Sequence, residues 1–236
     1  MRMPYAKRMT YALRAPNKKW LAPALAVIVV GFLAFSLPPY FTGGTRVPAT
    51  FALHYPLLVG HVMFASVAMV AAVAQIWPRL RVRHPVLHRR VGRVYVYTAI
   101  PAAACAMVIG AATPFGPFLA VSNVFLVSVW LWFTINGYLA ARQRRFADHR
   151  RHMVRSATLA LSIITNRIWA PVLFIALHPL QDSVFDGNEE HFLWFAAGVG
   201  AWLGWSIPLL AVQWWLNRKP VIAPSSISQP ADTRPV

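Results

Sequence analysis

The chain has 236 residues, of which 58% are hydrophobic and 12% charged, and its formal net charge at pH 7 is +17. This composition excludes a soluble globular domain of this length and indicates a polytopic membrane protein. Because the basic residues stand in short blocks between apolar segments about 20 residues long, they indicate membrane topology, and we expect no nucleic-acid partner.

The chain begins with a basic segment and a first apolar run. Residues 1–19 contain six Lys or Arg and no acid, and we expect them to form a cytoplasmic tail. The first span is expected from Trp20 to Phe35, with Pro38 and Pro39 ending its helix. The run is too long for a signal peptide and lacks a small-x-small cleavage site, which favours a retained anchor.

The second apolar segment carries a polar stripe. Residues seven apart return to nearly the same face of an α-helix, so His54, His61, Ala68 and Gln75 form one stripe about 31 Å long. That length matches the hydrocarbon thickness of a bilayer. Imidazole and amide groups facing lipid would lack hydrogen-bond partners, so we expect this stripe to face other helices or an internal cavity.

Four further spans complete the predicted bundle. They are expected at Val94–Ala112, Phe118–Ala141, Met153–Leu177 and Phe192–Leu216. The segments at 79–93 and 142–155 contain six arginines each, whereas the link from His178 to His191 contains four acids and no Lys or Arg. Basic segments face the cytoplasm, so 21 of the 23 Lys and Arg fall on the inner side.

The sequence therefore predicts an all-α membrane protein that is a single bundle of six transmembrane helices, with both termini cytoplasmic. The bundle occupies residues 20–217, and the Pro/Ser-rich segment 218–236 reads as a disordered tail. We expect the bacterial inner (plasma) membrane as the location, with anionic lipid headgroups as partners of the basic cytoplasmic face.

The predicted topology sorts the eight histidines into two layers. The outer layer holds His54, His61, His178 and His191, and the inner layer holds His84, His88, His149 and His152. Histidine is the commonest metal ligand, and haem sites in bundles use inward side chains of facing helices. The candidate ligands for haem iron or another metal are His61, His88, His149 and His152. The alternative is that histidines at span ends only meet headgroups and water.

The inner histidines suggest the sharpest hypothesis. His88 opens the third span, and His149 and His152, three residues apart, share a face at the mouth of the fifth. Imidazoles from two helix mouths would then reach one metal or haem iron. Arg89, Arg93 and Arg155 would bind the propionates of a b-type haem or another anion.

Arg167 is predicted to lie near the bilayer middle. It follows Arg155 by twelve residues, about 18 Å along a helix, and a central arginine costs about 2.5–3.5 kcal/mol on insertion scales. No Asp or Glu lies in any predicted span. We expect Arg167 to be held by backbone carbonyls, by water, by an anionic ligand, or by amides of the second and fourth spans, namely Gln75, Asn123 or Asn136.

Two motifs carry a family resemblance. The segment H-R-R-V-G-R-V-Y at 88–95, preceded by His61 and Q-I-W-P-R at 75–79, resembles the bacterial predicted-membrane-protein family called domain of unknown function 2306, as does H-R-R-H-M-V-R at 149–155. The resemblance spans Leu53 to Pro171 and implies a small inner-membrane bundle without an established activity. Residue by residue it marks His61, Gln75, His88, Gly92, Arg93, Tyr95, His149, Met153, Arg155 and Arg167.

Six-helix di-haem b-type cytochromes are a more distant likeness, resting on architecture and histidine layers. They carry four ligand histidines in four consecutive spans, whereas the fourth span here has none. Three hypotheses follow: a b-type haem or redox protein with an unidentified redox partner, a lipid- or small-molecule-handling protein centred on Arg167, and a non-catalytic assembly factor. Motifs of hydrolases are absent, and the sequence alone does not decide whether the chain is an enzyme.

Overall fold

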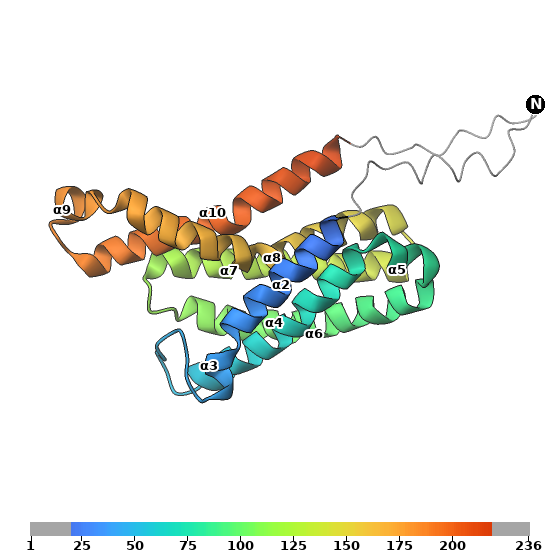
Figure 1. Ribbon diagram of the computed structural model, residues 1–236, viewed down its shortest axis with the longest axis horizontal. Helices are drawn as coiled ribbons and strands as arrows, with labels where there is room; N and C mark the ends of the chain where they lie inside the picture. The colour runs from blue at the N-terminus through green and yellow to red at the C-terminus, as the bar shows by residue number, and fades with distance from the viewer. Residues whose placement is uncertain (1–19, 219–236) are drawn as a thin grey trace, which may run out of the picture.

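The computed structural model describes residues 20–218, and every regular element within them is a helix (Figure 1). Five helices are long and apolar enough to cross a membrane, namely α4 (His54–Ile76), α6 (Pro85–Ala111), α7 (Pro117–Arg142), α8 (Phe146–Leu177) and α10 (Glu189–Asn217). The shorter ones are α2 (Leu21–Ser36), α3 (Pro38–Phe41), α5 (Pro78–Arg83) and α9 (Leu180–Phe185). The predicted all-α multi-pass class is confirmed, while the tails at 1–19 and 219–236 lie outside the described residues.

The first predicted span is shorter than the other five. Helix α2 has 16 residues, about 24 Å, which is less than the hydrocarbon thickness. Leu37 keeps helical dihedral angles, with φ −76° and ψ −35°, and leads directly into α3. The helical path from Leu21 to Phe41 is therefore nearly continuous across the Pro38-Pro39 pair.

For two spans, the predicted start lies several residues after the observed start of the helix. Helix α6 begins at Pro85 where Val94 was expected, and α8 begins at Phe146 where Met153 was expected. Hydropathy detects only the part of a helix that lies in hydrocarbon, whereas both helices continue through their arginine-rich first turns. Proline at the first helical position also favours the earlier start of α6.

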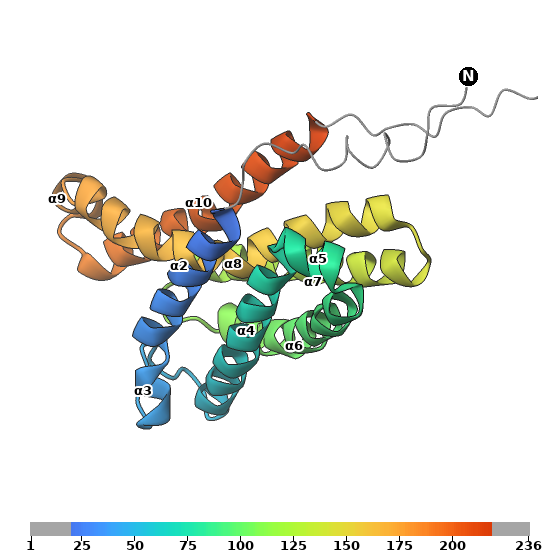
Figure 2. The same cartoon turned by 45° about the vertical axis from the view of Figure 1, so that its right-hand side comes forward.

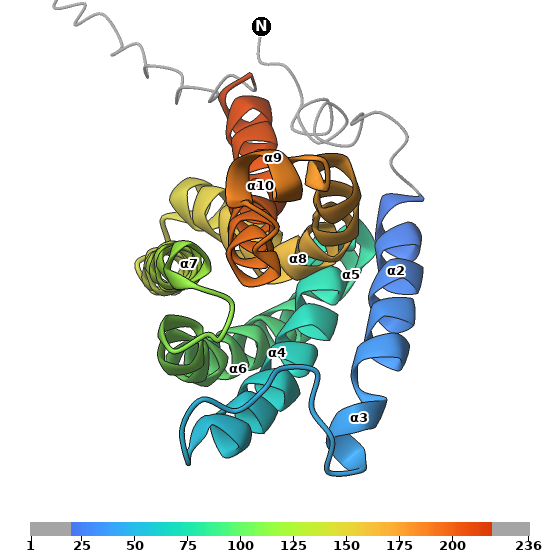
Figure 3. The ribbon, with the colours of Figure 1, turned by 90° about the vertical axis from the view of Figure 1, so that its left-hand side faces the viewer.

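Five helices form the central bundle, and α2 packs outside it. Helices α4, α6, α7, α8 and α10 all contribute buried side chains to the main core, α10 through Trp205, and α10 packs against α8 and α7 (Figures 1 and 3). Figure 2 shows α2 beside α4 on the outside of this set. A smaller apolar cluster joins α2 to α4 and to the middle of α8 through Val29, Met69 and residues 161–164.

The core between α4 and α6 is built from small side chains. Ala68, Ala71 and Ala72 of α4 face Ala99, Ala102, Ala103 and Ala106 of α6 in one buried cluster. Small residues let two helices approach closely in a membrane, where packing is the main attraction between them. The polar stripe of α4 lies on this inward side as predicted, with His54 buried and His61 and Gln75 half-buried.

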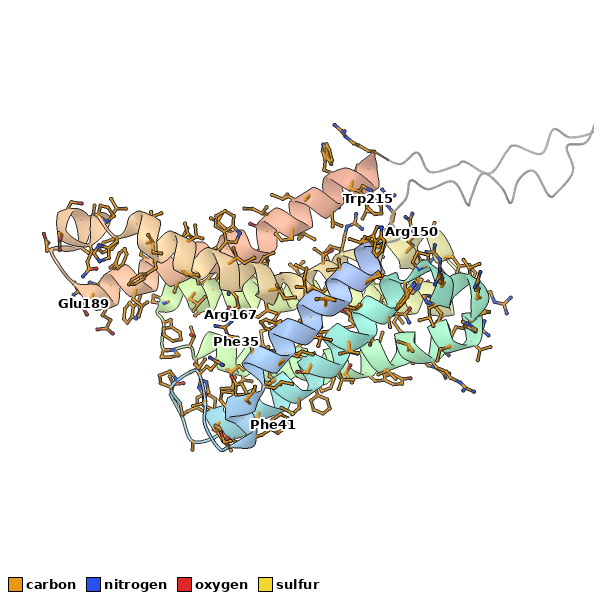
Figure 4. The ribbon with its side chains drawn as sticks, viewed as in Figure 1. Phe35, Phe41, Arg150, Arg167, Glu189 and Trp215 are labelled. Carbon is orange, nitrogen blue, oxygen red and sulfur yellow. The ribbon has the colours of Figure 1, made fainter. Side chains whose placement is uncertain are left out.

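The long axis of the molecule has a basic end and an acidic end. We call the basic end the region of residues 79–93 and 142–155, and the acidic end the region of α9 and the start of α10. In Figure 1, α5 and the turn between α7 and α8 lie at one end with the first described residues of α2 and the last of α10, whereas α9 lies at the other. Arg150 and Glu189, labelled in Figure 4, mark these two ends.

Candidate functional site

The start of α6 is fixed against the end of α4 by Gln75. Its Nε2 atom donates a hydrogen bond of 2.8 Å to the backbone carbonyl of His88. Gly92, one turn further along α6, faces this amide, and a Cβ there would make an ordinary van der Waals contact with Gln75 Oε1 at 3.5 Å. The end of the α4 stripe therefore sets the position of His88.

His149 is oriented by α7. Its Nδ1 atom lies 2.8 Å from the carbonyl oxygen of Gly137. A carbonyl only accepts, so Nδ1 is the donor, and in the neutral ring Nε2 then carries no proton. Histidines that ligate metals are commonly oriented in this way. Gly137 also leaves space for the α8 side chains, because a Cβ there would meet Met153 and, at 3.3 Å, the Cβ of His152.

His88 and His152 contain buried nitrogens without partners. Within residues 20–218, the Nδ1 atoms of both rings are two of only four buried side-chain nitrogen or oxygen atoms that make no hydrogen bond. Leaving a buried polar atom unpaired costs about 1–3 kcal/mol. The His152 ring packs on Phe133 of α7 at 5.8 Å, and His88 lies close enough to His149 for their charges to interact. We call His88, His149 and His152 the inner histidine cluster.

A buried hydrogen-bond network lies deeper in the bundle, next to this cluster. The Tyr95 hydroxyl of α6 lies 2.6 Å from Ser156 Oγ of α8 and accepts a 3.2 Å hydrogen bond from the Trp130 indole of α7. Ser156 also pairs with Thr134 of α7 at 2.6 Å. Three helices are thus joined at one level, and α6 and α8 meet across the bundle. We call these four residues the hydroxyl network.

Sequence reasoning missed most of the hydroxyl network. Tyr95 was marked through the family resemblance, but Ser156, Thr134 and Trp130 were not expected at the site. A signal for Ser156 was present, because it follows His149 by seven residues and therefore shares its helix face. Thr134 and Trp130 are four residues apart and share a face of α7 in the same way.

The predicted arginines do not converge on the histidines. Both Nε and Nη2 of Arg155 donate to Gln213 Oε1 of α10, at 2.9 and 2.6 Å, and its guanidinium lies over the Phe133 ring. Arg93 is exposed and interacts with Tyr97 and Tyr138 on the outer surface of α6 and α7. Neither position supports the expected pairing with propionates.

Arg167 is exposed on the half of α8 that extends toward α9, where Figure 4 labels it. No described residue pairs with it. The amides expected to hold it bond elsewhere: Gln75 to His88, Asn123 to the Gly110 carbonyl, and Asn136 to the Trp132 carbonyl of its own helix. The expected clamp by spans two and four is therefore wrong.

The outer histidines do not form a second cluster. His61 Nδ1 pairs with the Ala102 carbonyl of α6 at 2.9 Å, and His54 pairs with Thr50. His178 and His191 lie at the acidic end among aromatic rings. In the part of the chain that the structure describes, no three His, Cys, Asp or Glu side chains come together as a metal-binding group.

The site described above lies within the part of the chain that a protein-family model matches. The family described as "Predicted membrane protein (DUF2306)" matches residues 58–215. The chain belongs to this family. The match runs from α4 into α10, past the Pro171 limit of the motif resemblance, and includes every candidate site residue. No curated protein and no solved structure matches the chain, so the DUF2306 family supplies a membrane location and no activity.

Proposed function

We propose that this DUF2306 protein binds a b-type haem at its basic end through His149 of α8 and His88 of α6. The observation that carries the proposal is the set of unpaired imidazole nitrogens in the inner histidine cluster. Gly137 holds His149 with Nε2 free, and the Nδ1 atoms of His88 and His152 are buried without partners. Two imidazoles from different helices suffice for haem iron, so the proposal needs no three-ligand group.

Haem would supply one-electron chemistry, and the protein would supply ligand positions and surroundings. Gln75 fixes the backbone of His88, Gly137 orients the His149 imidazole, and the hydroxyl network closes the deeper side of the cluster. Ligation by His88 through Nδ1 would also relieve the cost of that unpaired nitrogen. The redox partner would approach from the side of the basic end.

The experiment is the reduced-minus-oxidised visible spectrum of protein purified from cells supplied with a haem precursor. We expect a b-type α-band and Soret band in the wild type, and their loss in His149→Ala and His88→Ala. His84→Ala is the matched control, because His84 is exposed one turn before His88 and should leave the spectrum unchanged. A wild-type protein that takes up no haem, even when haemin is added, would end the proposal.

We propose further that the helical path of α2 and α3 is a sixth span, with both termini in the cytoplasm of a bacterial cell. Most described arginines lie at the basic end, with Arg46 and Arg167 as exceptions, and this grouping supports the orientation. The first described residues of α2 and the last of α10 lie toward that same end (Figure 1). A reporter fused after Asn217 should report cytoplasm, and one inserted at Gly187 should report periplasm. A periplasmic signal after Asn217 would reverse the proposed orientation.

A second candidate function is the handling of an anionic lipid or small molecule at Arg167. The supporting observation is an exposed guanidinium within a membrane-crossing helix, without a partner among the described residues. Under this hypothesis Arg167→Leu should abolish binding or transport of an anionic amphiphile while raising thermal stability, and Arg167→Lys should retain part of it. An Arg167→Leu variant that is more stable and fully functional would exclude this role.

A further inference from the structure

Two arginines and two tyrosines meet on the outside of the bundle, along the seam between α6 and α7. On α6, Arg93 and Tyr97 are four residues apart, and on α7, Tyr138 and Arg142 are four residues apart. The two helices are antiparallel neighbours. Both arginines therefore lie nearer the basic end, and both tyrosines lie one turn deeper, so the cluster has an arginine layer and a tyrosine layer.

Direct contacts join Tyr97, Tyr138 and Arg142. The rings of Tyr97 and Tyr138 lie 6.4 Å apart with an interplanar angle of 56°, and Arg142 Nη1 donates to the Tyr138 hydroxyl at 3.4 Å. Both tyrosines interact electrostatically with both arginines. Tyr97 is 60% exposed, and the arginines are exposed as well, so the cluster is open to an external ligand.

No carboxylate neutralises this cluster in residues 20–218. Asp148 is the one described acid at the basic end, and it already pairs with Arg145 at 2.6 Å. Arg93 makes no hydrogen bond to another described residue, and the hydrogen bond of Arg142 to Tyr138 uses a single donor of its five. The guanidinium and phenol groups therefore present many free donors and a double positive charge, which suit the oxygens of a phosphate.

The surroundings fit a lipid phosphate. Arginine and tyrosine at a helix end mark the membrane interface, where headgroups lie. Beyond the tyrosines, the same seam exposes Ile100 and Ile135, which are 38% and 42% exposed and would contact acyl chains. We propose that Arg93, Tyr97, Tyr138 and Arg142 form a binding site for the phosphate of an anionic phospholipid. The site is independent of the haem proposal, because lipid retention and haem absorbance are separate measurements.

The test is native mass spectrometry of the full chain in detergent, titrated with phosphatidylglycerol, with phosphatidylcholine, or with inorganic phosphate. We expect the wild type to retain phosphatidylglycerol in preference to phosphatidylcholine. Loss of one charge-assisted hydrogen bond weakens binding about tenfold or more, so Arg93→Gln/Arg142→Gln should weaken phosphatidylglycerol binding by at least that factor. Tyr97→Phe/Tyr138→Phe should weaken it less, by about threefold to tenfold.

The matched control is Arg79→Gln/Arg83→Gln, which removes two exposed arginines of α5 at the same end. It should retain wild-type affinity. Equal losses in the control and the test variant would mean that only overall charge matters, and would overturn the site. Arg93→Lys/Arg142→Lys keeps the charge and checks that folding is intact. If the protein bound inorganic phosphate as tightly as phosphatidylglycerol, the assignment to a phospholipid would also be overturned.

Discussion

The two halves of the bundle are held together differently. Toward the basic end, side-chain hydrogen bonds join separate helices, as in Tyr95 to Ser156 and Arg155 to Gln213. Toward the acidic end, ring contacts such as Phe174 with Phe192 at 5.4 Å and Phe185 with Phe195 at 5.5 Å are added to hydrogen bonds such as that of Trp205 to Ser122. Hydrogen bonds are directional and fix the rotation of each helix, whereas ring packing tolerates sliding. A site that requires fixed geometry is therefore better placed in the basic half.

Removing one hydroxyl from the basic half should have the largest effect. Tyr95→Phe deletes the partner of Ser156 and leaves the buried Trp130 indole N–H without an acceptor. We expect a loss of about 2 kcal/mol in the free energy of unfolding, measured by denaturant unfolding in detergent micelles. Tyr97→Phe, at a 60% exposed position, is the control and should change stability by less than about 0.5 kcal/mol. Equal effects of both variants would contradict the comparison.

The contact between α8 and α10 provides a second, smaller test. A Cβ on Gly204 would lie 2.9 Å from Asn166 Cβ and 3.0 Å from its Cα, whereas one on Gly200 would lie 3.7 Å from Ala170. Overpacking costs about 1–3 kcal/mol, partly offset by the better helix propensity of alanine. We expect Gly204→Ala to lower the midpoint of thermal unfolding and Gly200→Ala to leave it unchanged or raise it. The reverse order would show that the helices approach most closely near the acidic end.

The smallest effect is expected at Thr50, near the outer end of α4. Its hydroxyl lies 2.7 Å from the Ala112 carbonyl and 2.8 Å from His54 Nδ1. Water is available at this partly exposed position, so Thr50→Val should cost less than about 1 kcal/mol. The measurement is the same denaturant unfolding curve. A loss as large as that of Tyr95→Phe would mean that hydrogen bonds hold both halves equally.

Much of the fold was predictable from the sequence. Hydropathy and charge located five membrane-crossing helices, and the sevenfold spacing of His54, His61, Ala68 and Gln75 identified the inward face of α4. Both inferences depend on periodicity and burial, which act within one helix. Helix starts were placed too late because the arginine-rich turns of α6 and α8 are helical outside the apolar stretch.

Contacts between helices were less predictable. Arg167 was expected beside amides of the second and fourth spans, but those amides bond elsewhere. Which side chains meet depends on helix crossing and rotation, which sequence spacing does not encode. His88 was nevertheless expected near His149, because each residue comes shortly after a turn at the basic end. The charge of His149 does act on His88.

Helix α8 is longer than the bilayer that it crosses. Its 32 residues measure about 48 Å, and even a tilt of about 40° would leave a projection of about 37 Å against a hydrocarbon core of about 30 Å. At least one turn therefore extends into water. Because the half of α8 toward α9 is uncharged except for Arg167, the extending part is its start, where Arg150 and Arg151 stand in the second turn. His149 thus lies where water-soluble reagents that modify histidine would reach it from the side of the basic end without crossing the membrane.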